Sequence, residues 1–244
     1  MDEARILDVW SQGRTRPGSR RLLLLAAAYP DRTPEELARL SVGRCNALLL
    51  QDRMATFGCR FDGETCCPGC GERLEISLEF EELLGSDDPG EEPADVACHL
   101  RIGDAVLPFR LPTVGDIEQA AACPDADSAV RVLLRACLTV DEHGSRHGPA
   151  PDTITEASLL QALDIELRRR DVHADLRIRT DCPDCGVTFE AALDPASLYW
   201  EELEDRARQL LIDVHRLAVA YGWSERESLG LDPVRRAGYL ELIG

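Results

Sequence analysis

The hydrophobic positions in the first quarter of the chain recur at helical spacing. Thr33 followed by Pro34 marks the clearest helix start, because Thr caps helices well and Pro is tolerated at the first helical position. The polar stretch 13–20 predicts a turn. The helices expected in this quarter cover residues 5–12, 21–28, 33–40 and 44–56.

After Gly58 the hydrophobic period changes from helical to two, as is typical of half-buried strands. Gly103-Asp104 predicts a hairpin turn between two of these strands. Residues 81–95 are rich in acids and contain no basic residue, so we expect a loop there, and a second loop at 141–152. The expected strands are 74–80, 100–102, 107–109, 174–178 and 187–193.

In the second half of the chain, most hydrophobic positions again recur at helical spacing. Asp194-Pro195 opens a long helix with an apolar stripe, and Gly222 ends it. Ser224 with Glu227 forms a capping box for a short helix, and Asp232-Pro233 starts the last one. The other expected helices begin at Thr113 or cover 127–139 and 155–170.

The charge balance narrows the possible functions. The chain has 244 residues, with 27 basic and 45 acidic side chains and a formal net charge of −18, and every basic residue is Arg. Lys-based chemistry is therefore excluded, and most of the surface would repel a phosphate backbone. No apolar run reaches the ~20 residues that span a bilayer, so no membrane contact is expected. The acidic N-terminus lacks a signal-peptide pattern, so we expect a cytoplasmic protein whose 10 Cys are reduced.

Four of the cysteines form two matching motifs. Cys67-Pro68-Gly69-Cys70-Gly71 and Cys182-Pro183-Asp184-Cys185-Gly186 both read C-P-x-C-G, and each leads into a predicted strand. This spacing on a tight turn presents both sulfurs to one point, as in a zinc knuckle. Two knuckles complete a tetrahedral four-thiolate site, so we expect one structural Zn²⁺. The predicted ligands are Cys67, Cys70, Cys182 and Cys185.

The surroundings of the two motifs also match. A helix, a strand, a knuckle and a second strand form a unit that is used twice, with residues 71–181 between Cys70 and Cys182. We therefore expect one zinc ribbon whose halves are related by a pseudo-twofold axis. Aligning Cys67 with Cys182 pairs Ala47-Leu48 with Ala162-Leu163, Arg53 with Arg168, Thr65 with Thr180, Glu75 with Glu190 and Leu78 with Leu193.

Other interpretations of the cysteines stay open. Cys66 is adjacent to Cys67 and could replace it as a ligand, although the Pro after both Cys67 and Cys182 favours Cys67. Redox C-x-x-C pairs normally stand at a helix N-terminus, whereas a strand follows both motifs here, which favours zinc. The cysteines without a partner at ligand spacing are expected to be small buried residues: Cys45, Cys59, Cys98, Cys123 and Cys137.

No catalytic motif is present in the sequence, and a closed four-thiolate zinc leaves no position for a catalytic water, so we expect no enzyme activity. The expected fold is α+β, mostly helical with a split zinc ribbon and a small antiparallel sheet. Its predicted parts are an N-terminal helical region 1–57, the ribbon 58–82 plus 172–194, an insertion 83–171 and a C-terminal helical region 195–244.

The last fifty residues carry the most specific signal. They contain His215-Arg216-Leu217-Ala218, Tyr221-Gly222-Trp223-Ser224-Glu225, Arg235-Arg236 and Tyr239-Leu240. Earlier segments add to it: both knuckles, Phe109-Arg110-Leu111-Pro112-Thr113, and Val42-Gly43-Arg44 before Ala47-Leu48-Leu49-Leu50.

Together these segments resemble a family of baseplate-associated proteins of contractile phage tails and phage-tail-like injection systems, related to the baseplate hub or hub-assembly proteins of T-even-like phages. The resemblance covers nearly the whole chain. Leu229-Gly230-Leu231 departs from it, because Gly would loosen the corner after the short helix. The resemblance implies a structural or assembly role, with other baseplate or hub proteins as partners.

The aromatic residues of the tail motif have two interpretations. Tyr221, Trp223 and Tyr239 could pack the C-terminal helices together. Alternatively, Trp223, Arg235, Arg236 and Tyr239 present an aromatic and Arg surface, a composition enriched at protein interfaces. Both interpretations can hold at once.

A zinc-ribbon regulator that binds nucleic acid or the transcription machinery is the alternative function, with the short C-terminal helices as a helix-turn-helix. The net charge counts against it. The run Arg168-Arg169-Arg170 beside Arg177 and Arg179 is therefore expected to meet an acidic protein surface. The sequence leaves the oligomeric state open.

Overall fold

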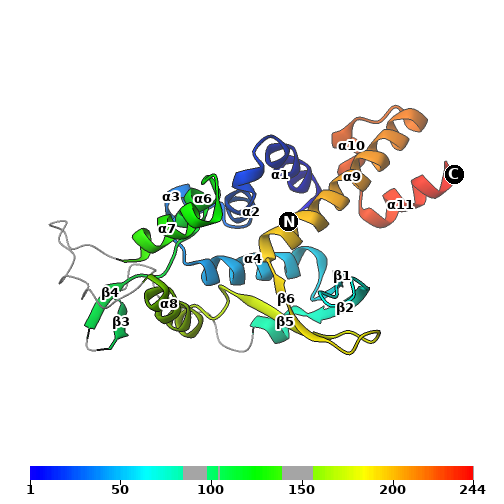
Figure 1. The fold of residues 1–244 in the computed structure, drawn as a ribbon. Helices are drawn as coiled ribbons and strands as arrows, with labels where there is room; N and C mark the ends of the chain where they lie inside the picture. The colour runs from blue at the N-terminus through cyan, green and yellow to red at the C-terminus, as the bar shows by residue number, and fades with distance from the viewer. Residues whose placement is uncertain (85–97, 104, 139–155, 244) are drawn as a thin grey trace.

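The structure, a computed structural model, describes residues 1–84, 98–103, 105–138 and 156–243. Helices predominate, and the strands of the described part form two-stranded antiparallel sheets, which confirms the predicted fold class. Figure 1 shows a central helical body, a smaller lobe on one side, two hairpins, and an arm that ends at the C-terminus.

The central body contains the main hydrophobic core. It is built from α1 (Glu3–Thr15), α2 (Arg20–Ala28), α3 (Pro34–Ala38), α4 (Val42–Phe57) and the part of α9 (Pro195–Tyr221) that reaches to Leu210. Tyr199 and Trp200 of α9 are buried among Leu and Ile side chains of the other four helices. Thr33 caps α3, as the sequence predicts, and the structure adds a capping box with Glu36.

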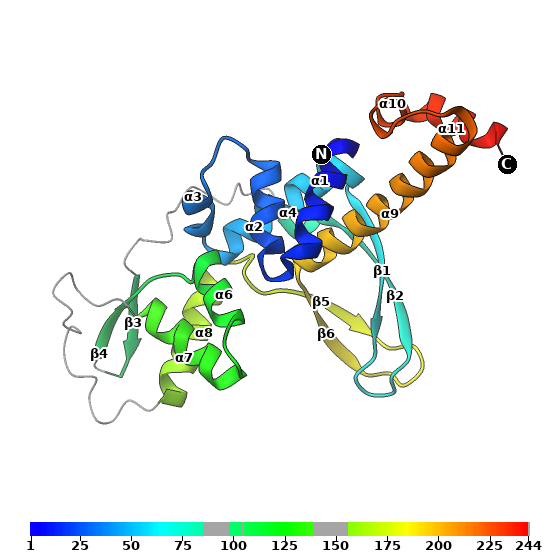
Figure 2. The ribbon, with the colours of Figure 1, turned by 90° about the horizontal axis from the view of Figure 1, so that it is seen from above.

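The smaller lobe stands beside the central body in Figure 2 and has a core of its own. Its elements are β3 (Cys98–Ile102), β4 (Ala105–Phe109), α6 (Val114–Ala121), α7 (Ala126–Cys137) and α8 (Glu156–Arg170). Polar contacts tie it to the start of α4. Ser41 pairs with Thr113 in an isolated β-bridge, and the buried Asp171 accepts hydrogen bonds from Ser41 Oγ and the Gly43 amide. A side chain at position 43 would collide with that carboxylate.

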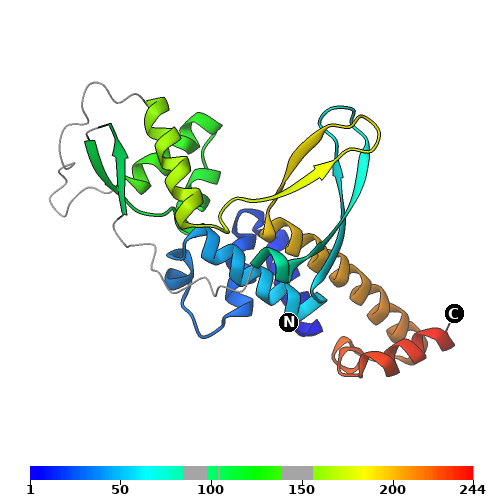
Figure 3. The same ribbon diagram turned by 90° about the horizontal axis from the view of Figure 1, so that it is seen from below.

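Two hairpins carry the knuckles, and their pairing registers are the same. The first consists of β1 (Arg60–Cys66) and β2 (Arg73–Glu79), the second of β5 (Leu176–Asp181) and β6 (Thr188–Leu193). Thr65 faces Leu74 in the first, and Thr180 faces Phe189 in the second. Every pair of the second hairpin is a pair of the first shifted by 182 − 67 = 115 residues at both positions, so the repeat extends from the sequence to the backbone. Figure 3 shows the two hairpins rising from separate bases and meeting at their tips.

The C-terminal arm, defined here as residues 205–243, extends away from the central body (Figures 1 and 3). It contains the second half of α9, α10 (Glu225–Leu229) and α11 (Pro233–Leu242). Gly222 ends α9 in a left-handed conformation (φ 71°), and a capping box of Ser224 and Glu227 starts α10, as the sequence predicts.

Several element boundaries differ from the sequence predictions. The α1 helix runs on to Thr15, and Pro17–Ser19 form a 3-10 turn, so little of the expected turn at 13–20 remains. Residues Phe80–Leu84 form a short helix, α5, because Phe80 is buried and stacks on Phe61 instead of continuing the strand. The β5 strand begins at Leu176, later than predicted, because the Ala174 amide turns back to Asp171 O. The predicted loop at 141–152, most of the loop at 81–95 and the turn residue Asp104 lie outside the described residues.

Candidate metal centre

Each knuckle is a tight turn at the tip of its hairpin. Two backbone hydrogen bonds close the first one, from Gly71 N–H to Cys67 O and from Cys67 N–H to Glu72 O, both 2.8 Å long. The second knuckle has the same two bonds 115 residues later, both 2.9 Å long. The glycines that end the motifs, Gly71 and Gly186, have φ angles of 79° and 72°, which favour Gly because a Cβ is strained there.

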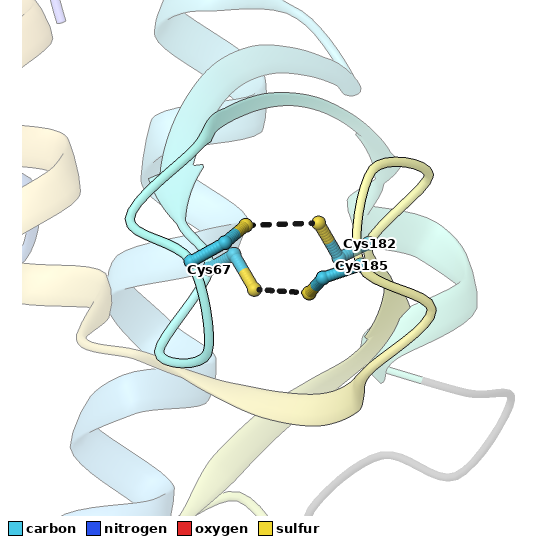
Figure 4. Close-up of side chains that lie close together, drawn as sticks. Cys67, Cys182 and Cys185 are labelled. Carbon is cyan, nitrogen blue, oxygen red and sulfur yellow. Dashed lines mark hydrogen bonds between the residues drawn. The ribbon is translucent and has the colours of Figure 1, made fainter.

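The four cysteines of the two motifs converge on one point. The Sγ atoms of Cys67 and Cys185 lie 3.5 Å apart, those of Cys70 and Cys182 lie 3.6 Å apart, and all four lie within 4.8 Å of one another (Figure 4). Sulfurs at 2.3 Å from a tetrahedral metal ion are separated by about 3.8 Å, so this arrangement is compatible with a single bound ion. Within the described residues, no other group of three or more His, Cys, Asp or Glu converges in this way.

The structure distinguishes Cys67 from its neighbour as a ligand candidate. Cys67 is buried and belongs to the cluster, whereas Cys66 is exposed at the end of β1 opposite Arg73 and lies outside it. The Pro that follows Cys67 and Cys182 is the sequence signal for this choice. Burial repeats as well, since the first cysteine of each motif is buried and the second, Cys70 or Cys185, is exposed.

The thiols strongly influence one another's protonation. Burial raises the pKa of Cys67, but the amides of Cys70 and Gly69 and the neighbouring thiols donate to its sulfur and lower the pKa to about 7. The Glu72 amide favours the thiolate of Cys70, yet the surrounding thiols, Cys185 foremost, raise its pKa to about 12. The cluster thus stabilises the thiolate of Cys67 and disfavours a second thiolate at Cys70. A cation among the four sulfurs would remove that opposition.

Apolar side chains pack against the two buried cysteines of the cluster. Leu74 and Phe189, which are equivalent in the repeat, pack against the buried Cys67 and Cys182. Gly69 lies against the opposite knuckle, since a Cβ there would stand 3.2 Å from Val187 Cγ2 and 3.5 Å from Cys185 Sγ. This close approach accounts for Gly at a position where the other knuckle has Asp184.

The base of the first hairpin is fixed by a buried arginine whose role the sequence did not reveal. Arg53 donates to the carbonyl oxygens of Gly58 and Arg60 and to both carboxylate oxygens of Glu202 on α9. Its guanidinium also lies over the Phe80 ring, 4.7 Å from the centroid. The only sequence signal was its alignment with Arg168, which is exposed and pairs with Asp164 and Asp175.

The four residues predicted to bind a partner have different environments. Trp223 and Tyr239 pack edge to face at 4.9 Å, and Trp223 also stacks on Tyr221 at 4.8 Å, so the packing interpretation of these rings is what the structure contains. Arg235 is exposed. Arg236 is buried and donates to both carboxylate oxygens of Glu3 on α1, so its side chain ties the arm to the body instead of facing solvent.

The predicted basic patch is largely neutralised within the chain. Arg168 pairs with Asp164 and Asp175, and Arg169 and Arg170 both pair with Glu166. The five cysteines predicted to be small buried residues divide by burial, with Cys45, Cys98 and Cys137 buried and Cys59 and Cys123 partly exposed.

No protein-family model, curated protein or solved structure matches the chain. Among the described helices, none combines the length and the apolar run that crossing a bilayer requires.

Proposed function

We propose that the chain is a structural or assembly protein of a contractile-tail or injection-system baseplate. In this role it works in the cytoplasm or within the particle, binds other baseplate or hub components and carries out no catalysis. One Zn²⁺ on Cys67, Cys70, Cys182 and Cys185 holds its scaffold together. The observation that carries the structural role is the convergence of four sulfurs from hairpins more than a hundred residues apart.

The donor set favours zinc. Four thiolates in tetrahedral array suit Zn²⁺ or iron, and a single ion fits sulfurs that all lie within 4.8 Å of one another. Four protein ligands fill the coordination sphere, which is typical of structural rather than catalytic zinc. Zinc-loaded sites of this kind stabilise the folded state by about 10–16 kcal/mol of apparent binding free energy.

Elemental analysis of the purified chain tests the metal. We expect one zinc and no iron per chain. Protein that is soluble and folded without metal, and that forms a reversible disulfide within each C-x-x-C motif, would show that the motifs are redox pairs.

The baseplate role is supported by the resemblance of the tail motif and both knuckles, and its test is genetic. Deleting the gene in the producing bacterium should abolish complete sheathed particles in electron micrographs, and the wild-type gene supplied in trans should restore them. Normal particles in the deletion strain would contradict the role. Immunoblots of purified particles then distinguish a permanent component from an assembly factor.

Binding to nucleic acid is the competing function, and the paired arginines count against it. Arg168, Arg169 and Arg170 face carboxylates of their own chain, which leaves little free positive charge for phosphates. We expect no retention of random duplex DNA on nitrocellulose at low salt. Retention that falls steeply with salt would favour the regulator instead.

A further inference from the structure

The outer side of α9 within the arm is apolar and uncovered. Val219 is 75% exposed and Ile212 is 52% exposed. Over residues 209–222, all of which the structure describes, the exposed side chains include no carboxylate and no guanidinium, since Asp213 is buried and Arg216 is half-buried. Because 30% of the whole chain is charged, such a stretch marks a surface that meets another protein.

This apolar side is a continuous stripe. Leu211, Ile212, His215, Ala218 and Val219 recur at spacings of three and four, so they share one face of the helix. The buried residues Leu210, Asp213 and Leu217 lie on the opposite face. A stripe with this spacing packs best against a second helix.

The stripe is self-complementary about His215. Leu211 and Ile212 stand four and three residues before it, and Ala218 and Val219 stand three and four residues after it. In an antiparallel pair of identical helices centred on His215, the larger residues of one helix would face the smaller residues of the other. A twofold interface requires this match of one patch to itself.

Charge also permits this pairing at the arm. Residues 205–243 contain six acidic and six basic side chains, so the arm is neutral although the chain carries −18. Arg208 stands seven residues before His215, and Gly222, which ends α9, stands seven residues after it. In the antiparallel pair, Arg208 of one copy would therefore face the C-terminal end of the other copy's α9, where the free carbonyl groups favour a cation. The acidic remainder of the chain stays apart, because the arm extends away from the body (Figure 3).

We infer that a second copy of this chain binds the stripe, with the two α9 helices antiparallel and crossing at His215. This inference concerns the arm and does not depend on the metal or on the proposed baseplate role. The stripe spans only about three turns of helix, so the dimer interface is small. We therefore expect a weak dimer with a dissociation constant in the micromolar range.

Sedimentation equilibrium of the full, metal-loaded chain from 1 to 200 μM tests the dimer. We expect the mass to rise with concentration from 26.9 kDa toward twice that value. Val219→Glu should stay at the monomer mass, while the matched control Val234→Glu should dimerise like the wild type. Val234 is 80% exposed on α11, outside the stripe. A wild-type monomer at 200 μM, or equal behaviour of the two variants, would overturn the inference and leave a different protein as the occupant.

A charge pair tests the antiparallel register. In this register position 212 of one copy faces position 219 of the other. Ile212→Arg alone and Val219→Glu alone should both be monomeric, and an equimolar mixture of the two should dimerise again. A mixture that stays monomeric would exclude the antiparallel arrangement. Circular dichroism of each variant should match the wild type, because both side chains are exposed in the monomer.

Discussion

Replacing Arg53 with Met should destabilise the protein far more than the same change at Arg168, its equivalent in the repeat. Arg53 is 2% exposed, and its guanidinium supplies donors to two backbone carbonyls and to Glu202. Met fills a similar volume but donates nothing. The change therefore leaves a partly buried carboxylate and two carbonyl groups without their donors.

The expected loss in the free energy of unfolding is about 3–5 kcal/mol, the usual cost of removing one partner of a buried ion pair. Arg168 is 48% exposed, and its partners Asp164 and Asp175 are 61% and 33% exposed. Exposed pairs of this kind contribute about 0–1 kcal/mol. With a urea m-value of about 2 kcal/mol per M, the midpoint should fall by roughly 1.5–2.5 M for Arg53→Met and by less than about 0.5 M for Arg168→Met.

Urea titration of the metal-loaded protein, followed by far-ultraviolet circular dichroism, measures both midpoints under one condition. Equal losses for the two variants, or a loss below about 1 kcal/mol for Arg53→Met, would refute the argument that burial separates these equivalent arginines. Arg53→Lys should fall between Met and the wild type, because Lys keeps the charge but cannot form the bidentate pair.

Three further changes test the cysteine cluster, the central body and the arm. Cys182→Ser should abolish stoichiometric metal binding and lower the thermal midpoint, because Cys182 supplies one of the four sulfurs through which the proposed ion would join both hairpins. Gly13→Ala should lower the free energy of unfolding, measured by urea titration, by about 1–3 kcal/mol, because a Cβ there collides with the buried indole ring of Trp200. Burial raises the pKa of Glu3, but its bonds to Arg236 and Arg206 outweigh this and hold the pKa below its usual range. The stability from Glu3 is therefore present above its unfolded pKa of about 4.3 and lost as pH falls through the lower folded value, so Glu3→Gln should differ most from the wild type near neutral pH.

Each of these predictions has its own control. Cys66→Ser should bind metal normally, and equal metal loss in both cysteine variants would contradict the ligand assignment. Gly238→Ala should gain up to about 1 kcal/mol, because nothing lies near its Cβ in α11. If the stability difference between Glu3→Gln and the wild type grows toward pH 3, Glu3 does not act through a lowered pKa.

The cysteine cluster and the repeat were predictable from the sequence because they depend on local spacing. C-P-x-C-G predicts a turn with two sulfurs on one side, and its second copy predicts where the other two sulfurs come from. The helix starts at Thr33 and Ser224 were equally local, since each capping residue and its Glu partner are three positions apart.

The arginines could not be assigned this way, because their environments depend on distant parts of the chain. Arg53 and Arg168 align in sequence, yet only Arg53 meets α9, which follows about 150 residues later. Arg236 was predicted to face a partner and is instead buried against Glu3, 233 residues away. Long-range burial of a charged side chain leaves no periodic signal.

The split between the two knuckles also has a consequence for synthesis on the ribosome. After Cys70 has been made, 115 further residues (185 − 70) must be added before Cys185 can complete the ligand set. At about 5–20 residues per second, the second pair of thiols is complete about 6–23 s after the first pair. The smaller lobe is made during that interval and has its own core, so it can fold before the four sulfurs of the two hairpins meet. With the proposed four-sulfur site, metal binding is thus a late step in the synthesis of each chain.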